Sequence, residues 1–214
     1  MSGNGSTVVT KKPPIIETIG AQYYAFNNGA NGEYDPSSYE ETIVKTETVK
    51  SATVTESSES VQIRASGKDY MLKTLLSYVD IEVEELAHDA DDLAKMRGDI
   101  IDNSGLIQGV TTPEKPFFAY GKVVKLSGGN FRLDWYPKCQ LVENSDEANT
   151  SESNFSEQNN RLTIRAFAFD SEGKTVKNSV DSTSAKFPTG MTEELFFSKV
   201  VITPADLTSL IPTA

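Results

Sequence analysis

The sequence predicts a mainly β protein, an antiparallel β-sandwich or barrel-like fold with one short flanking α-helix. Three observations favour this class. Short segments rich in valine, isoleucine, threonine and aromatic residues recur along the chain, with glycine, asparagine and serine clusters between them. Residues 78–86 alternate between apolar and acidic side chains, which is the period of a strand with one buried face. Residues 89–98 carry both the start and the stop signals of a helix.

The first third of the chain begins with a predicted flexible N-terminal arm, residues 1–18, which is rich in serine, glycine and asparagine and contains Lys-Lys-Pro-Pro. A short strand is expected near residues 21–26, followed by a loop with Asn-Gly turns. Residues 39–65 are dense in threonine and valine and predict two strands, joined by an exposed connection around residues 56–60.

The segment "YVDIEVEEL" (78–86) predicts a strand whose two faces differ in character. Val79, Ile81 and Val83 fall on one face, which we expect to be buried. The acidic residues between them fall on the opposite, solvated face, namely Asp80, Glu82 and Glu84.

The next segment, "DADDLAKMRG" (89–98), changes period and predicts the helix. Asp89 is a suitable N-cap, acids occupy the first turn, Lys95 and Arg97 lie in the last turn, and Gly98 can end the helix. The expected packing side is formed by Leu93, Ala94 and Met96.

The second half predicts a loop at residues 99–116 and then a hairpin, with arms at 117–126 and 130–142 around a Ser-Gly-Gly-Asn turn. A long acidic loop is expected at 143–160. Strands follow at 161–170 and 195–203. Residues 204–214 predict a C-terminal arm, as one helical turn or an extended segment. Residues 19–203 are therefore expected to form a single β-sandwich domain.

Composition narrows the possible functions. The net charge is −11, whereas a protein that grips nucleic acid is normally basic. No apolar run approaches the length of a membrane span, and the N-terminus lacks the pattern of a signal peptide. The one cysteine cannot form an internal disulfide and fits a reducing compartment.

The sequence gives little support for a catalytic site or a metal site. His88 lies beside three aspartates, but it has no partner histidine or cysteine, so a polar helix start explains it better than a zinc site or a general base. Cys139 lies in a predicted strand and would need that same histidine as a base, so a structural cysteine is favoured. Alternating carboxylates could serve glycosidic chemistry, but they more often form a solvated face. We predict no enzyme activity, no cofactor and no metal.

The order of elements carries a resemblance. "IGAQYYAF", then "SYVDIEVEELA", the helix ending in "LAKMRG" and the hairpin "KPFFAYGKVVKLSGGNFRLDWYPKCQL" follow one another in the chain. From about Ile19 to Ile202 this order resembles the major tail protein, or tail tube protein, of long-tailed non-contractile bacteriophages of the phi13 and TP901-1 type. The resemblance implies a β-sandwich with a flanking helix, and six copies closed into rings that stack into a tube.

The implied role is that of a structural virion protein, assembled in the bacterial host cytoplasm, whose tube conducts DNA ejection. The implied partners are further copies of the chain, the tape measure protein, and the tail tip and tail terminator proteins. Genomic DNA would pass through the tube without specific binding, and no membrane partner is implied. An acidic protein suits such a conduit, because phosphate is repelled rather than bound.

Two sets of residues become candidates on this basis. We hypothesise that Asp80, Glu82 and Glu84 face the lumen, although an outer or interface position fits the alternation equally well. Trp135, Tyr136 and Lys138 belong to a hairpin expected in the tube wall, where the aromatic rings pack inside the protomer or against a neighbour. A capsid decoration protein, a β-sandwich adhesin or carbohydrate-binding module, and a small hydrolase that uses Asp/Glu pairs remain alternatives.

Overall fold

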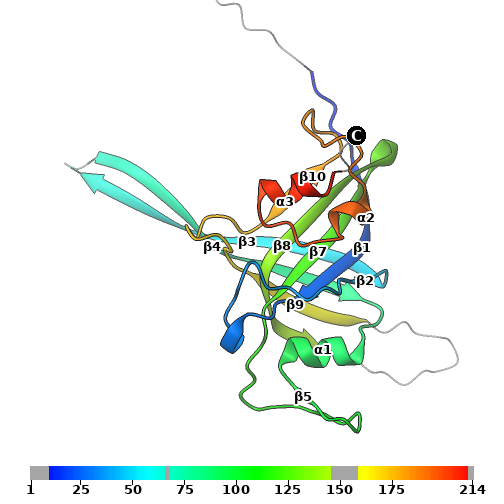
Figure 1. The fold of residues 1–214 in the computed structure, drawn as a ribbon. Helices are drawn as coiled ribbons and strands as arrows, with labels where there is room; N and C mark the ends of the chain where they lie inside the picture. Colours follow the sequence, from blue (N-terminus) through cyan, green and yellow to red (C-terminus); the bar gives the residue numbers. More distant parts are fainter. Residues whose placement is uncertain (1–9, 66–67, 146–158, 212–214) are drawn as a thin grey trace, which may run out of the picture.

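The computed structural model describes residues 10–65, 68–145 and 159–211. It is mainly β and antiparallel, as the sequence predicts, with the short helix α1 at one side (Figure 1). The strands of the large sheet follow the order β2-β1-β7-β8-β9-β4-β3, with β10 paired to β8. Their bounds are β1 Ile16–Phe26, β2 Val44–Thr46, β3 Val49–Ala65, β4 Lys68–Glu85, β7 Phe118–Leu126, β8 Asn130–Ser145, β9 Asn160–Ala166 and β10 Asn178–Asp181.

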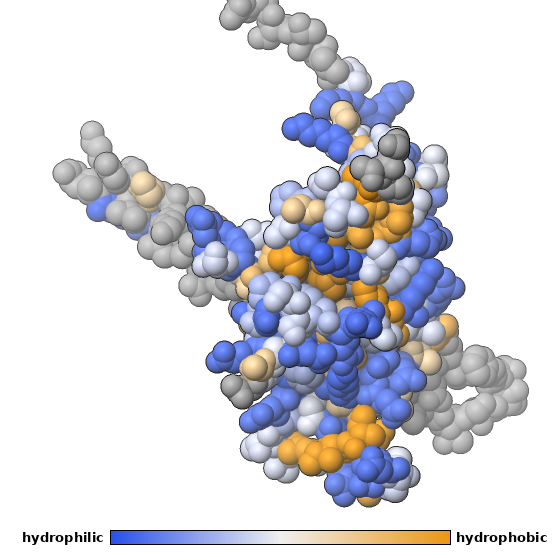
Figure 2. Space-filling model, viewed as in Figure 1, coloured by the Kyte–Doolittle hydropathy of each residue, from blue (hydrophilic) through white to orange (hydrophobic). Residues whose placement is uncertain are grey.

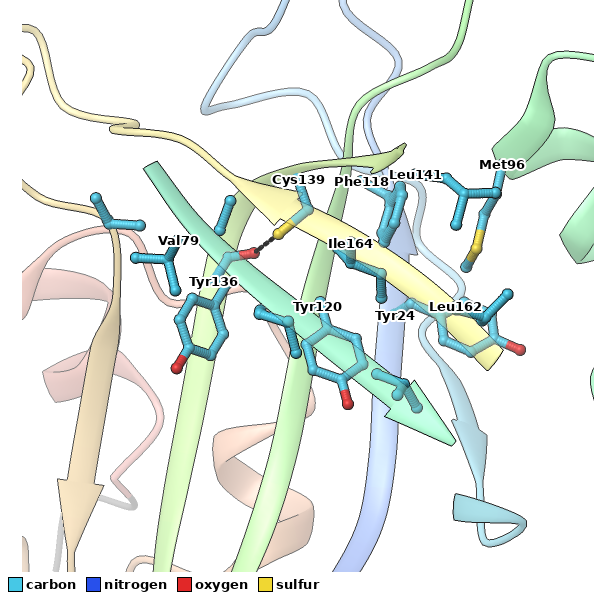
Figure 3. Packing of buried hydrophobic residues seen from close by; sticks show 14 of the residues in the cluster. Tyr24, Val79, Met96, Phe118, Tyr120, Tyr136, Cys139, Leu141, Leu162 and Ile164 are labelled. Carbon is cyan, nitrogen blue, oxygen red and sulfur yellow. Dashed lines mark hydrogen bonds between the residues drawn. The ribbon is translucent and has the colours of Figure 1, made fainter. Parts of the chain in front are cut away.

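The sheet curls, so that β3 at one end of the strand order contacts β1 near the other end. Its concave side encloses one hydrophobic core, which includes Tyr24, Ile81, Tyr136 and Ile164 (Figure 3). Because neighbouring residues of a strand point to opposite faces, Tyr23 and Trp135 belong to a second core on the other face. The strands β1, β7 and β8 therefore carry buried side chains on both faces.

The C-terminal segment covers this second core. It contains two short helices, α2 (Glu193–Phe196) and α3 (Pro204–Ser209), which lie over β7, β8 and β10 in Figure 1. Phe196, Phe197, Val200 and Val201 are all buried. The strand predicted at residues 195–203 is therefore wrong. A short apolar run fits a strand and a buried helical turn equally well, and here Thr192 caps the turn by accepting a hydrogen bond from the Leu195 amide.

Helix α1 (Ala90–Arg97) confirms the predicted helix and its ends. The Asp89 side chain accepts hydrogen bonds from the amides of Asp91 and Asp92, and Gly98 ends the helix with φ of 74°. Met96 is buried against the concave core, where Figure 3 places it beside the strands.

Other strands begin or end at different residues than the sequence predicts. The predicted connection at residues 56–60 is wrong, because β3 runs through it unbroken and pairs with β4 from Val49 to Ala65. β1 begins at Ile16, inside the range expected as a flexible arm. The loop at 99–116 contains a small two-stranded sheet of β5 (Ile100–Ile101) and β6 (Ile107–Gln108).

The strand at residues 78–86 and the hairpin at 117–142 are confirmed as parts of β4, β7 and β8. The strand at 161–170 is confirmed up to Ala166, where β9 ends. Of the two forms expected for the C-terminal arm, residues 204–209 adopt the helical one. Most of the acidic loop predicted at 143–160 lies outside the described residues, as does the start of the N-terminal arm.

Candidate interaction surfaces

The outer face of β4 carries the three candidate lumen residues. Asp80 accepts two hydrogen bonds from Arg165 on β9, at 2.7 and 2.9 Å. Glu84 accepts a hydrogen bond of 2.8 Å from Asn159 Nδ2, and Glu82 is exposed. Strand pairing places Arg161 opposite Glu84 and Arg165 opposite Asp80, so three carboxylates share this face with two guanidinium groups.

This face is therefore more nearly neutral than the sequence of β4 alone indicates. On its other side β3 contributes hydroxyl groups, with Thr53 opposite Glu82 and Thr55 opposite Asp80. The surface is hydrophilic, and its position in any assembly stays a prediction.

The candidate wall residues divide between the two cores. The Trp135 side chain is fully buried, and its Nε1 donates a hydrogen bond of 3.3 Å to the Phe196 carbonyl. Tyr136 points to the opposite face and is 2% exposed. Lys138 Nζ lies 5.0 Å from the ring centroid of Tyr34. Trp135 and Tyr136 thus pack inside the protomer, which was one of the two positions expected for them.

Cys139 is buried in the concave core, and its Sγ donates a hydrogen bond of 3.2 Å to the Tyr136 carbonyl (Figure 3). Burial raises the pKa of this thiol well above its ordinary value. A thiol that stays protonated is a poor nucleophile, so the structural interpretation of Cys139 is the better one.

A buried polar chain, which the sequence analysis missed, connects the end of β4 and the turn before α1 with β1 and β7. Glu85 is fully buried, with its Oε1 2.6 Å from Nδ1 of His88. Its Oε2 accepts a hydrogen bond of 2.6 Å from Gln22 Nε2, and Gln22 Oε1 accepts one from the Tyr120 hydroxyl. A signal was present, because Glu85 continues the inward-facing alternation of the strand. This network accounts for His88 as a structural residue.

A cavity of about 350 Å³ opens where β1 and β3 approach each other. We call it the basic cavity, and its lining is Ile16, Thr18, Ile19, Lys50, Ser51, Ala52, Val54, Lys122, Val124 and Arg132. Behind it lies Asp134, fully buried, with its Oδ2 3.5 Å from Lys122 Nζ and 3.4 Å from Arg132 Nε. Burial lowers the pKa of Lys122, and the Asp134 charge partly offsets this.

A larger cavity of about 560 Å³ lies between residues 36–43 and the C-terminal segment. We call it the acidic cavity, because its lining includes Glu40, Glu41 and Asp206 against a single lysine, Lys199. Two of these carboxylates form ion pairs, Glu40 with Lys95 and Asp206 with Lys199.

The β5–β6 hairpin exposes apolar side chains at the bottom of the molecule, where Figure 2 shows apolar surface gathered. We call these residues the apolar tip, and they are Ile100, Ile101, Leu106 and Ile107, with exposed fractions of 56, 43, 55 and 38%. Four large apolar side chains together on a small hairpin are typical of a contact surface.

Within the described ranges, no three histidine, cysteine, aspartate or glutamate side chains gather so as to hold a metal ion. None of the described helices is long and apolar enough to cross a membrane.

No protein family model matches the chain, and no curated protein matches it. Eight chains of solved structures match, one of them in the "Cryo-EM structure of the anti-feeding prophage (AFP) baseplate, 6-fold symmetrised". This match has 11% sequence identity, covers 80% of this chain and 97% of that chain, and has a TM-score of 0.42. At this level of similarity the match identifies neither a family nor a function for this chain.

Proposed function

We propose that this chain is a structural virion protein that polymerises, as stacked hexameric rings, into the tail tube of a long-tailed non-contractile bacteriophage. The observation that carries the proposal is a β-hairpin that extends beyond the sheet, with no third strand paired to it among the described residues. The kind of assembly is taken from the phage tail family that the order of sequence elements resembles.

The hairpin is the outer part of β3 and β4. β9 pairs with β4 only from Val79 to Glu85. From the Ser57–Tyr78 pair to the Ala65–Lys68 pair, β3 and β4 pair with each other and with no other described strand. Figure 1 shows this projecting hairpin in cyan, extending away from the body of the protein.

A lone two-stranded hairpin is marginally stable in water. This one contains the segment "YMLKTLLSY" (70–78), which is richer in apolar residues than a solvated hairpin requires, and Met71 is 51% exposed. Packing against another molecule would bury the apolar residues of such a segment and so stabilise the hairpin. In the proposed tube, that molecule is another copy of the chain.

The sheet also has an edge strand to which a strand of another molecule could be added. β3, with 17 residues, is the last strand of the order, and among the described strands only β4 is hydrogen-bonded to it. Long unpaired edges invite strand pairing between molecules. A contact between two different surfaces of one chain gives a closed ring when its rotation closes, which is the geometry proposed here.

The charge of the chain supports a role as a conduit. At a net charge of −11, the surface repels phosphate, so DNA would pass without binding. Within this proposal the face of Asp80, Glu82 and Glu84 lines the lumen. The tape measure protein would occupy the tube before DNA, and tail tip and tail terminator proteins would bound it.

Negative-stain electron microscopy of the purified protein across a concentration series tests the proposal. Hollow tubes or six-fold rings are the expected result. Particles that remain monomers or trimers, and that bind capsids when these are added, would instead favour a capsid decoration protein.

A further inference from the structure

The chain changes its strand partner between β2 and β3. β2 pairs with β1 at Gln22, Tyr23 and Tyr24, whereas from Val49 onward the chain pairs with β4 instead. The register of β1 also shifts between Ile19 and Gln22, and a bulge of this kind bends a strand. β1 and β3 therefore diverge from each other, and the basic cavity lies in the opening between them.

Both sides of this opening are strand edges. From Ile16 to Ala21, β1 is paired with β7 on one side and with no described strand on the other. Among the described strands only β4 is hydrogen-bonded to β3. An extended peptide that enters such an opening can add backbone hydrogen bonds to the sheet, which is how peptides bind to sheet edges. The opening therefore fits an extended segment better than a compact ligand.

Apolar side chains form much of the lining of the basic cavity. Val54 and Val124 lie in it, and Ile16, which also lines it, is 62% exposed. A dry apolar cavity of about 150 Å³ holds one benzene-sized group. The basic cavity, of about 350 Å³, has room for about two such groups. An inserted segment could therefore bury a small apolar side chain there and cover Ile16.

The polar part of the lining is close to balanced in charge. The buried Asp134 carboxylate lies near both Lys122 and Arg132, so charge alone does not select an occupant. The buried Nε of Arg132 has no hydrogen-bond acceptor among the described residues. A serine or threonine hydroxyl beside an apolar side chain would fit this lining, because the hydroxyl oxygen can accept that hydrogen bond.

The N-terminal segment "STVVT" (6–10) has these side chains. Alternate residues of a strand share a face, so each face of this segment would carry one valine and at least one hydroxyl. Valine and threonine also favour strands. The other long stretch outside the described ranges, residues 146–158, is rich in aspartate, glutamate, asparagine and serine, and most of these residue types are depleted in strands.

The described residues before β1 lead away from their own protomer. Residues 10–13 are exposed, and Figure 1 shows the chain before β1, in dark blue, running upward from the sheet. We propose that residues 6–10 of one copy insert as a strand into the basic cavity of a second copy, between β1 and β3. Two different surfaces meet, so the contact is heterologous and can continue from copy to copy. This inference rests on the proposed function, since it names one contact of that assembly.

A fluorescent synthetic peptide of residues 1–14, titrated with the full-length protein, tests the contact through fluorescence anisotropy. We expect saturable binding. The same peptide with Val8→Asp and Val9→Asp should bind at least about tenfold more weakly, because a carboxylate would enter an apolar lining. A peptide of residues 146–158 should not bind. Binding of that acidic peptide in place of the N-terminal one would show that charge selects the occupant, and would overturn the inference.

Two variants with the same substitution locate the binding site. Thr18→Trp fills the basic cavity, whereas Thr53→Trp changes a position on β3 that does not line it, and both threonines are exposed. Thr18→Trp should weaken binding of the N-terminal peptide by at least about tenfold, and Thr53→Trp should leave it unchanged. Equal affinities for the two variants would overturn the proposed site.

Electron microscopy of the full-length Val8→Asp, Val9→Asp variant separates this inference from the proposed function. Its assembly should need about tenfold more protein than that of wild type. Tubes that form at the wild-type concentration would overturn the strand contact and leave the proposed function standing. Wild-type protein that stays monomeric at every concentration, but binds the N-terminal peptide in the basic cavity, would overturn the proposed function and support the contact.

Discussion

The ring of Phe197 stacks on the ring of Tyr23, with the centroids 3.9 Å apart and the planes 6° from parallel. Phe197 also meets Trp135 edge-on, with the centroids 5.1 Å apart. These contacts join the C-terminal segment to β1 and β8, so the second core depends on residues that lie far apart in the chain.

Phe197→Ala is expected to lower the free energy of unfolding by about 3–5 kcal/mol, because it removes a fully packed ring and leaves a cavity. Urea unfolding followed by tryptophan fluorescence measures this loss, since Trp135 is the only tryptophan and contacts Phe197. Phe197→Leu should lose less, and the exposed Lys186→Ala should change stability by less than about 0.5 kcal/mol. A Phe197→Ala loss no larger than that of Lys186→Ala would contradict the packing described.

Gly121 on β7 allows Phe197 to approach the sheet. A Cβ built on Gly121 would lie 2.6 Å from Phe197 Cε1 and 3.0 Å from two ring atoms of Trp135. Gly121→Ala is therefore expected to destabilise the protein by about 1–3 kcal/mol through overpacking, and Gly121→Val by more.

Gly109→Ala is the matched control, because its nearest atoms lie at 3.9 and 4.0 Å, which is ordinary contact. Thermal unfolding of the two alanine variants compares them directly. If both variants melt at the wild-type temperature, the close approach of Phe197 to β7 is wrong.

The start of α3 should make stability depend on pH. Burial raises the pKa of Asp206, but the hydrogen bonds with Lys199 and Thr203 outweigh it and lower the pKa from 3.8 to about 2. A carboxylate with a depressed pKa contributes stability above its unfolded-state pKa, and the contribution is lost as the pH falls through the folded value. Asp206→Asn should thus cost about 1 kcal/mol at neutral pH, comparable to the loss of a helix cap.

The difference between Asp206→Asn and wild type should shrink as the pH falls from about 4 to about 2, and urea titrations at each pH measure it. Glu82→Gln, at an exposed position, controls for the general acid sensitivity of the protein. A difference that stays constant over this range would show that the Asp206 charge does not stabilise the start of α3, where the Asp206 and Thr203 side chains each accept a hydrogen bond from the other residue's amide.

The sequence patterns predict correctly those parts of the fold that depend on residues close together in the chain. The alternation of Val79, Ile81 and Val83 is a property of one strand, and the ends of α1 depend on the capping residues that flank it, Asp89 and Gly98. Residues 195–203 were mispredicted because a short apolar run is buried in either conformation, and only the partners in β1, β7 and β8 decide between them.

The candidate surfaces were predictable only in part, for the same reason. The acidic character of Asp80 is visible in the sequence, but its neutralising partner is Arg165, which lies 85 positions along the chain. Strand order and register bring these two together. The basic cavity likewise combines four strands, so no local pattern could have indicated it.

Shortening the projecting part of the β3–β4 hairpin would separate the requirements of folding from those of assembly. Ser58 and Leu76 are paired across the hairpin, so replacing residues 59–75 by Asn-Gly would close it with a two-residue turn. The concave core contains residues on β4 from Val79 onward and should remain intact. We expect the shortened protein to keep a cooperative unfolding transition close to that of wild type, and to form neither rings nor tubes under the electron microscope.

A control with Asn-Gly in place of residues 66–67 alone keeps the hairpin length and should assemble as wild type does. Assembly of the shortened protein at the wild-type concentration would mean that the hairpin does not pack on another copy, and it would remove the observation that carries the proposed function.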